Sequence, residues 1–442
     1  MKNNFFSLKK LLPVVTIVVI ALFFRFYNLE NRYSFEWDQE DDALKVMEMI
    51  NLHKPRLIGP RVANDNSFFV GPYHYYFLLP FYLLTNGDPV AGAYAAITVG
   101  IVTCLIAYFI SNSIFGSPSG FIAGLIFAIT PSLASWNVMY ASIYSLLIFY
   151  FCLQLIQSRQ SHFFYLSIFF LSLAANTHLV PASLIIPVAF SILASGYRPK
   201  LKNILIGFIL FIIPFFPLIV FDFRHQFLNI TKLIGFVTQR QVSPTYFPFL
   251  FLRSFWRSLG VFNLLPVVLE RITVLVLLLG GILSIKILKN KLLFTIWILT
   301  PLFLLSFYRG DIPEYYYGSV TVLIPIFTAA VLAKIKPKFI IILLLLPFVF
   351  LKTKQVMSDK SHVSLGSKKS VINSILKDSQ NQKFSISYNL PSGWNSGYEY
   401  LFQKYPQKIA NAPLRYFIYH TSSPPITGHP VYGQEALGVV RQ

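Results

Sequence analysis

Long apolar runs alternate with short basic turns along most of the chain. The runs fall at about 11–27, 90–111, 119–136, 142–158, 162–176, 179–195, 203–221, 267–285, 291–308, 316–333 and 338–351. A bilayer core takes roughly 20 apolar residues per helix and excludes open sheet edges, so each run predicts a spanning helix. We therefore predict an all-α polytopic membrane domain at residues 1–351, with about eleven spans.

The pattern changes after residue 351, where polar residues become frequent. Residues 384–388 and 416–420 favour strands, and residues 398–404 favour a helix. About 90 residues are enough for one small domain. We predict a small α/β domain at residues 352–442.

Lysines and arginines set the expected orientation, because they accumulate in short cytoplasmic loops. With the N-terminus inside, the cytoplasmic turns hold Arg159, Arg198, Lys200, Lys202, Lys286, Lys289, Lys291, Lys334, Lys336 and Lys338. Counting the apolar stretch Gly71–Leu84 as a span would reverse this parity, so we interpret it as an interfacial helix anchored by tyrosines. The first loop at 28–89 and the C-terminal domain then lie outside a membrane that we expect to be a bacterial inner membrane.

Composition agrees with a membrane protein and narrows the partners. The chain is 55% hydrophobic with mean hydropathy +0.60. Its formal charge of +20 needs no nucleic acid, because basic turns beside anionic headgroups account for it. Both cysteines, Cys104 and Cys152, lie in predicted spans, so the outer loops offer no disulfide and no thiolate metal site. A divalent metal has no clear ligand set in the sequence.

The first outer loop carries the sequence EWDQEDD, with five carboxylates in residues 36–42 of a chain that has 17 Asp and Glu in total. Carboxylates packed together at a membrane surface raise one another's pKa, and a raised pKa suits a general base. The alternative requires no function: Asp38 caps a helix whose first turn holds Gln39, Glu40 and Asp41.

Cations follow two predicted spans on the same outer side. Arg224 and His225 begin one loop, and Arg309 begins another. If these cations lie across a site from a carboxylate that acts as a general base, the site suits a substrate with a lipid tail and a phosphate at the interface. The alternative is that they only reach lipid headgroups.

A family resemblance rests on several of these segments. FEWDQEDDA after the first span, LIGPRV and GPYHYYFLLPFYLLTNGDP resemble the bacterial GT-C membrane glycosyltransferases of the family 39 type. These are relatives of the protein O-mannosyltransferases and of the aminoarabinose transferase that modifies lipid A. Weaker similarities are Trp136-Asn137, THLVP at 177–181, FDFRH at 221–225 and YRGDIPEYYY at 308–317. The resemblance covers residues 10–335.

The resemblance implies inverting transfer of a sugar from a polyprenyl phosphate to an acceptor hydroxyl of a glycolipid, polysaccharide or protein. It assigns the catalytic carboxylate to Asp38. Gln39 replaces the commoner Glu, Gly71-Pro72 replaces a Lys-Pro or His-Pro, and Asn137 replaces an aspartate of some relatives. The last departure weakens a case for bound metal.

The resemblance also suggests supporting roles for other residues. Those expected to orient the acceptor or the sugar are Glu40, Asp42, Asn137 and His178. Those expected to bind the donor phosphate are Arg224, His225 and Arg309. Those expected to contact sugar or lipid are Trp37, Tyr73, His74, Tyr75 and Glu314. The alternatives are a packed, hydrogen-bonded His178 and aromatic residues that form an interface belt.

Two other functions compete with the transferase. A transporter or flippase for a lipid-linked or anionic substrate would place ionisable residues within its spans and repeat broken helices in paired halves. An O-antigen ligase or polymerase would place its arginines and histidine in a large late loop. The acidic first loop favours the transferase, and the sugar, the polyprenol and the acceptor stay open.

Overall fold

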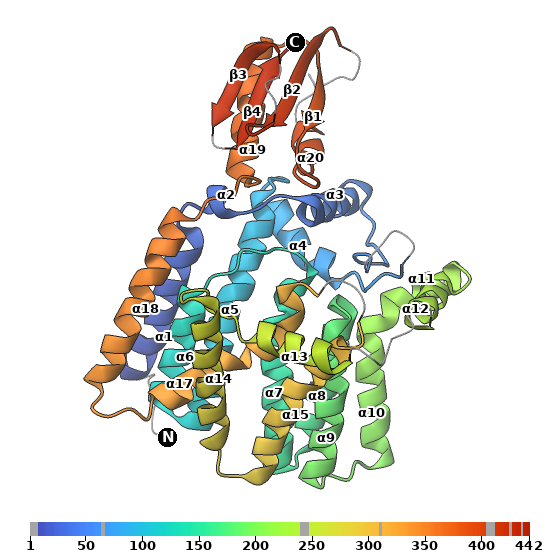
Figure 1. Cartoon of the computed structure of the whole chain (residues 1–442). Coiled ribbons are helices and arrows are strands. Elements are labelled where there is room, and N and C mark those ends of the chain that lie inside the picture. The colour runs from blue at the N-terminus through green and yellow to red at the C-terminus, as the bar shows by residue number, and fades with distance from the viewer. Residues whose placement is uncertain are drawn as a thin grey trace.

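The computed structural model describes residues 8–62, 67–238, 247–308, 312–403, 412–423, 427–434 and 436–442. Its larger part is a bundle in which each predicted span has its helix (Figure 1). These helices are α1 (Leu8–Phe26), α5 (Val90–Phe115), α6 (Ser117–Ile129), α7 (Ala141–Ser158), α8 (Ser161–Thr177), α9 (Ile185–Ser195), α10 (Leu201–Ile212), α14 (Val267–Leu283), α15 (Leu288–Leu305), α17 (Leu323–Leu332) and α18 (Phe339–Ser358).

By length and composition alone, some of these helices could cross a membrane. Within the described residues, 5 helices are long and apolar enough to cross a membrane, or 6 if the bent pair Glu314–Thr321 and Leu323–Leu332 counts as one. Several other apolar helices are shorter, among them Ser117–Ile129. The outward faces of α10, α14 and α18 expose large apolar side chains such as Phe208, Leu279 and Leu343, as lipid contact requires.

Short helices connect the bundle helices at one end. In the first loop these are α2 (Leu29–Arg32), α3 (Trp37–Leu52) and α4 (Tyr73–Leu84). Later ones are η1 (Asn137–Tyr140), η2 (Val180–Leu184), η3 (Ile213–Phe215), α11 (Phe216–Arg224), α12 (Leu228–Thr238), α13 (Phe247–Ser258), η5 (Glu314–Tyr317) and α16 (Gly318–Thr321). The interfacial stretch is indeed a helix, α4, but Tyr75 and Tyr82 are buried in protein, so they do not anchor it in the interface.

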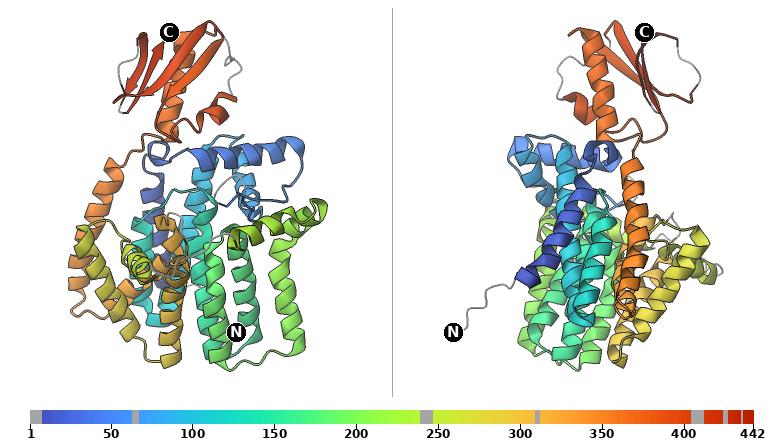
Figure 2. Two further views of the ribbon diagram at one scale, coloured as in Figure 1. Left: turned by 45° about the vertical axis from the view of Figure 1, so that its right-hand side comes forward. Right: turned by 90° about the vertical axis from the view of Figure 1, so that its left-hand side faces the viewer.

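A small sheet domain stands over the same end of the bundle (Figures 1 and 2). It contains α19 (Leu365–Ser379), β1 (Phe384–Asn389), α20 (Tyr398–Gln403), β2 (Leu414–His420), β3 (His429–Gln434) and β4 (Leu437–Arg441). The strand order is β1-β2-β4-β3, with β1 and β2 parallel and the other neighbours antiparallel. The two predicted strands and the predicted helix are present, whereas α19 and the β3–β4 pair were not predicted.

The placement of the turns bears on orientation. The basic turns α9–α10 and α14–α15 lie at the end of the bundle opposite the sheet domain (Figure 1). The acidic first loop lies at the sheet end. This separation of charge is what the predicted orientation requires, and the side that faces the cytoplasm stays a prediction. The predicted domain boundary at residue 351 falls inside α18, which continues to Ser358.

Candidate active site

The acidic segment forms the start of α3, and its cap is not Asp38. Glu36 is the N-cap residue, and its backbone N–H donates a hydrogen bond to Oε1 of Gln39 at 3.1 Å. This contact is the return half of a capping box, in which the third helical residue satisfies the cap's own amide. The helix-cap interpretation of Asp38 is therefore wrong, because Asp38 is already the second residue of the helix.

Asp38 faces a cavity of about 370 Å³. The start of α3 forms one wall, and the segment between α6 and η1 forms another. The lining residues are Arg32, Ser34, Glu36, Trp37, Asp38, Gln39, Pro131, Leu133, Ala134, Trp136 and Asp359. Trp37 has 70% of its surface exposed at this cavity, so it can still serve its predicted contact with sugar or lipid.

The surroundings of Asp38 make its carboxyl group a weaker acid than usual. Its side chain is exposed to the cavity, while the surrounding protein removes much of its bulk solvent. This burial, followed by the charges of Asp42 and Asp41, raises the pKa of Asp38 to about 6. A carboxylate that is both accessible and more basic than usual can take a proton near neutral pH.

Asp42, one helical turn further on, is placed differently. It is 5% exposed, and its Oδ2 accepts a hydrogen bond from Nε2 of the fully buried His74 at 2.7 Å. The other ring nitrogen of His74 lies 3.1 Å from the hydroxyl of Tyr140. Burial raises the pKa of Asp42, and His74 opposes the rise.

These contacts argue against the predicted substrate contacts of four residues. Asp42 is sealed against His74, so it cannot orient a substrate hydroxyl. His74 has both ring nitrogens engaged inside the protein, and Tyr75 is only 2% exposed, so neither is placed to contact sugar or lipid. Glu40 is also engaged elsewhere, because its Oε1 accepts a hydrogen bond from the backbone N–H of Tyr400 at 2.9 Å.

A second group of predicted residues gathers beyond Trp136. Nδ2 of Asn137 donates to the carbonyl of Thr177 at 2.7 Å, which fixes Asn137 beside His178. The ring of His178 lies 5.3 Å from that of Tyr316. Burial lowers the pKa of His178 to about 4, so this imidazole is neutral at pH 7. Asn137 and His178 thus share one neighbourhood with the cavity wall.

Two aromatic residues and one cation join this neighbourhood without a predicted role. The rings of Trp136 and Tyr315 lie 5.0 Å apart. Each of the two adjoins a predicted site residue in the sequence, and this adjacency is the signal that could have identified them. Glu314 is 2.7 Å from the guanidinium of Arg257 on α13. Glu314 is thus already engaged by a cation, so its predicted sugar contact would have to compete with this pair.

Two of the predicted phosphate-binding cations, Arg224 and His225, lie outside the lining of the Asp38 cavity that the described residues form. Both are exposed at the end of α11. Nδ1 of His225 lies 2.8 Å from the carbonyl of Phe221. Asn229 on α12 hydrogen-bonds the backbone of Phe69 at 2.7 and 3.2 Å, which joins this region to the first loop.

Tyr73 and Arg309 complete the predicted set. The hydroxyl of Tyr73 lies 3.5 Å from the carbonyl of Ile213 in η3, so α4 begins beside the element that precedes α11. Arg309 lies outside the described residues. Across the described ranges, no group of three His, Cys, Asp or Glu side chains is arranged to hold a metal ion.

Sequence comparison gives no relative: no family model and no curated protein matches the chain. Structural comparison does. ArnT from Cupriavidus metallidurans bound to undecaprenyl phosphate matches with a TM-score of 0.62 at 12% identity, over 97% of each chain. The oligosaccharyltransferase of Archaeoglobus fulgidus matches with a TM-score of 0.51 at 12% identity, over 85% of this chain and 60% of that one.

The chain has a GT-C fold. The ArnT match extends over the bundle and the sheet domain alike, so the predicted fold class is confirmed. Within this GT-C fold, identity near 12% carries no residue roles, and the roles rest on the geometry described above.

Proposed function

We propose that the protein is an inverting glycosyltransferase that moves a sugar from a polyprenyl phosphate to an acceptor hydroxyl on the outer face of the membrane. The observation that carries this proposal is the accessible Asp38 carboxylate, with a pKa of about 6, at the cavity of a GT-C fold. The solved structure of ArnT with undecaprenyl phosphate supports a lipid phosphate as the donor's leaving group.

The chemistry is a single displacement. The Asp38 carboxylate takes the proton of the acceptor hydroxyl as that oxygen bonds to the anomeric carbon. The bond from the anomeric carbon to the phosphate oxygen breaks, and polyprenyl phosphate leaves with the electron pair. Attack opposite the leaving group inverts the anomeric centre. Arg224 and His225 are the proposed cations for the leaving phosphate, with Arg309 as a third.

Transfer from a panel of radiolabelled polyprenyl-phosphate sugars tests the proposal, with donor hydrolysis followed in parallel. Asp38→Asn should lower the rate by roughly 10²- to 10⁴-fold, the usual contribution of a general base. Asp41→Asn is the matched control, because Asp41 is on the same helix and pairs with Lys45 at 3.6 Å. It should keep most of the activity.

Two outcomes would contradict the proposal. An Asp38→Asn protein that transfers sugar as fast as wild type would remove Asp38 from the chemistry. A wild-type protein that uses no donor but moves a lipid-linked sugar across a vesicle membrane would favour the transporter instead.

A further inference from the structure

The sheet domain does not sit on the bundle as a separate body. Buried side chains of the first loop and of the sheet domain form one continuous apolar cluster. Phe35, Tyr75 and Tyr82 belong to it from the first loop, and Leu365 and Tyr398 belong to it from the sheet domain. Burial of this kind stabilises the contact and fixes the two parts against each other.

The sheet-domain side holds Phe35 by both of its backbone groups. The N–H of Phe35 donates to the carbonyl of Val363 at 3.1 Å, and its carbonyl accepts from Nζ of Lys368 at 2.6 Å. Lys368 is 1% exposed and also donates to the carbonyl of Ser396. Phe35 directly precedes the N-cap of α3, so these bonds set where the helix begins.

A glycine makes this close approach possible. Gly397 has a φ of 90°, and a Cβ at this position would meet the carbonyl oxygen of Phe35 at 2.5 Å and Nζ of Lys368 at 3.0 Å. Any other residue would therefore push the segment before α20 away from Phe35. Burial lowers the pKa of Lys368 to about 8, so the side chain is still mostly an ammonium at pH 7. Its Nζ lies 5.3 Å from the centre of the Tyr398 ring, a contact that favours the charged form.

The second contact lies on the other side of Asp38 in the sequence. Glu40 accepts the backbone N–H of Tyr400 at 2.9 Å. Residues 35 and 40 are thus both fixed by the sheet domain, and Asp38 lies between them on the first turn of α3.

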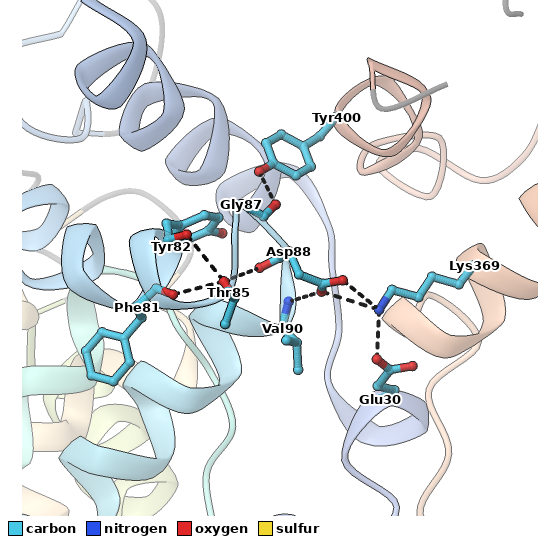
Figure 3. Close-up of polar contacts among 9 residues, drawn as sticks. All are labelled: Glu30, Phe81, Tyr82, Thr85, Gly87, Asp88, Val90, Lys369 and Tyr400. Atoms are coloured by element: carbon cyan, nitrogen blue, oxygen red, sulfur yellow. Dashed lines mark hydrogen bonds and ion pairs between the residues drawn. The ribbon is translucent and has the colours of Figure 1, made fainter. Parts of the chain in front are cut away.

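A third set of contacts docks the domain without touching α3 (Figure 3). Lys369 lies 2.7 Å from Glu30 and 3.3 Å from Asp88. The hydroxyl of Tyr400 donates to the carbonyl of Gly87 at 2.6 Å. Lys369 is adjacent to Lys368 in the sequence but reaches other partners, so it offers a matched control.

We propose that Lys368 is a positioning residue for the Asp38 carboxylate, and that the sheet domain acts as a clamp on the start of α3. This inference rests on the proposed function for its catalytic part. Removing the ammonium leaves the carbonyls of Phe35 and Ser396 buried without a donor, which favours movement of the helix start. Asp38 would then meet the acceptor in fewer productive orientations.

Two readouts on Lys368→Met and Lys369→Met test the clamp. The first is hydrogen exchange of the backbone amides at 37–42, which needs no substrate. The second is steady-state transfer. Lys368→Met should speed exchange at 37–42 and lower kcat about tenfold, with the KM for the donor unchanged. Lys369→Met should leave exchange at 37–42 and kcat within about twofold of wild type, because its partners Glu30 and Asp88 lie outside α3 and are partly exposed.

The outcomes separate the clamp from the proposed function. Unchanged exchange in Lys368→Met overturns the clamp. Faster exchange with an unchanged kcat overturns the positioning role. If wild type transfers no sugar, the proposed function fails, and the exchange result alone decides whether Lys368 fixes α3. If Lys368→Met does not fold, Glu40→Ala tests the clamp instead. This change removes the acceptor for Tyr400 and a negative charge near Lys368, and it should give a smaller effect in the same direction.

Discussion

Two successive turns of α3 carry aspartates, four residues apart on the same side of the helix, with opposite surroundings. Asp38 is exposed to a cavity, whereas Asp42 is 5% exposed and bound to His74. Burial raises the pKa of both, so a raised pKa alone does not mark a general base. Access to substrate decides between them. The first turn of α3, at the cavity, is suited to chemistry, and the next turn, packed against α4, holds the first loop together.

The largest expected difference between the buried and the accessible carboxylates of α3 is in stability. Asp42→Ala should lower the free energy of unfolding by about 3 kcal/mol, because the buried His74, which also contacts Tyr140, loses its carboxylate partner. Asp41→Ala, on the exposed side of the helix, should change it by less than about 0.5 kcal/mol. Denaturant unfolding of the purified protein, followed by tryptophan fluorescence, measures both. Equal stability of the two variants would contradict the buried role of Asp42.

The pH dependence of transfer sharpens the same comparison. Asp38 must be ionised to act as a base, so the rate should rise with pH around a midpoint of about 6. Asp41→Asn removes a neighbouring negative charge, so it should shift this midpoint to lower pH. A rate that does not change between pH 5 and pH 7 would argue against Asp38 as the base.

The contribution of Asp38 to protein stability changes with pH in the opposite direction: it falls as the pH rises, whereas the transfer rate increases. The pKa of Asp38 is raised in the folded protein, so its contribution to stability is present below its unfolded pKa of about 4 and is lost as the pH rises through about 6. Asp38→Asn should therefore melt no lower than wild type at pH 7. Loss of activity without loss of stability is the expected signature of the accessible Asp38.

Hydropathy predicted the spans and the change at the sheet domain, because lipid exposure acts on each segment separately. Charge density indicated the acidic segment at residues 36–42, and the family resemblance selected Asp38 within it. The charge pattern alone could not separate Asp38 from Asp42, since the difference depends on how α4 brings His74 against α3. It also could not predict that Glu40 would meet Tyr400, 360 residues away, or that Lys368 would reach Phe35. Such pairings depend on tertiary packing and leave no local pattern.

The contrast between engaged and available groups extends to the cations. Arg32 lines the Asp38 cavity, but its guanidinium donates to the carbonyls of Phe24 and Tyr27 at 2.9 and 3.0 Å and lies 3.3 Å from Asp359. Arg224 is exposed at the end of α11 instead. An available cation is the better candidate for a lipid phosphate, although exposure to solvent limits what its charge contributes.

Arg224→Gln therefore gives the smallest expected effect. It should raise the KM for the donor about threefold, which corresponds to less than about 1 kcal/mol, and leave kcat unchanged. Lys232→Gln removes a cation from α12 in the same region and should leave the KM within error of wild type. The difference should shrink at high salt, because exposed charges are screened. An unchanged KM in Arg224→Gln would return Arg224 to a contact with lipid headgroups. The next candidate for the phosphate cation would then be Arg257, because its partner Glu314 adjoins Tyr315, whose ring packs against Trp136 of the cavity wall.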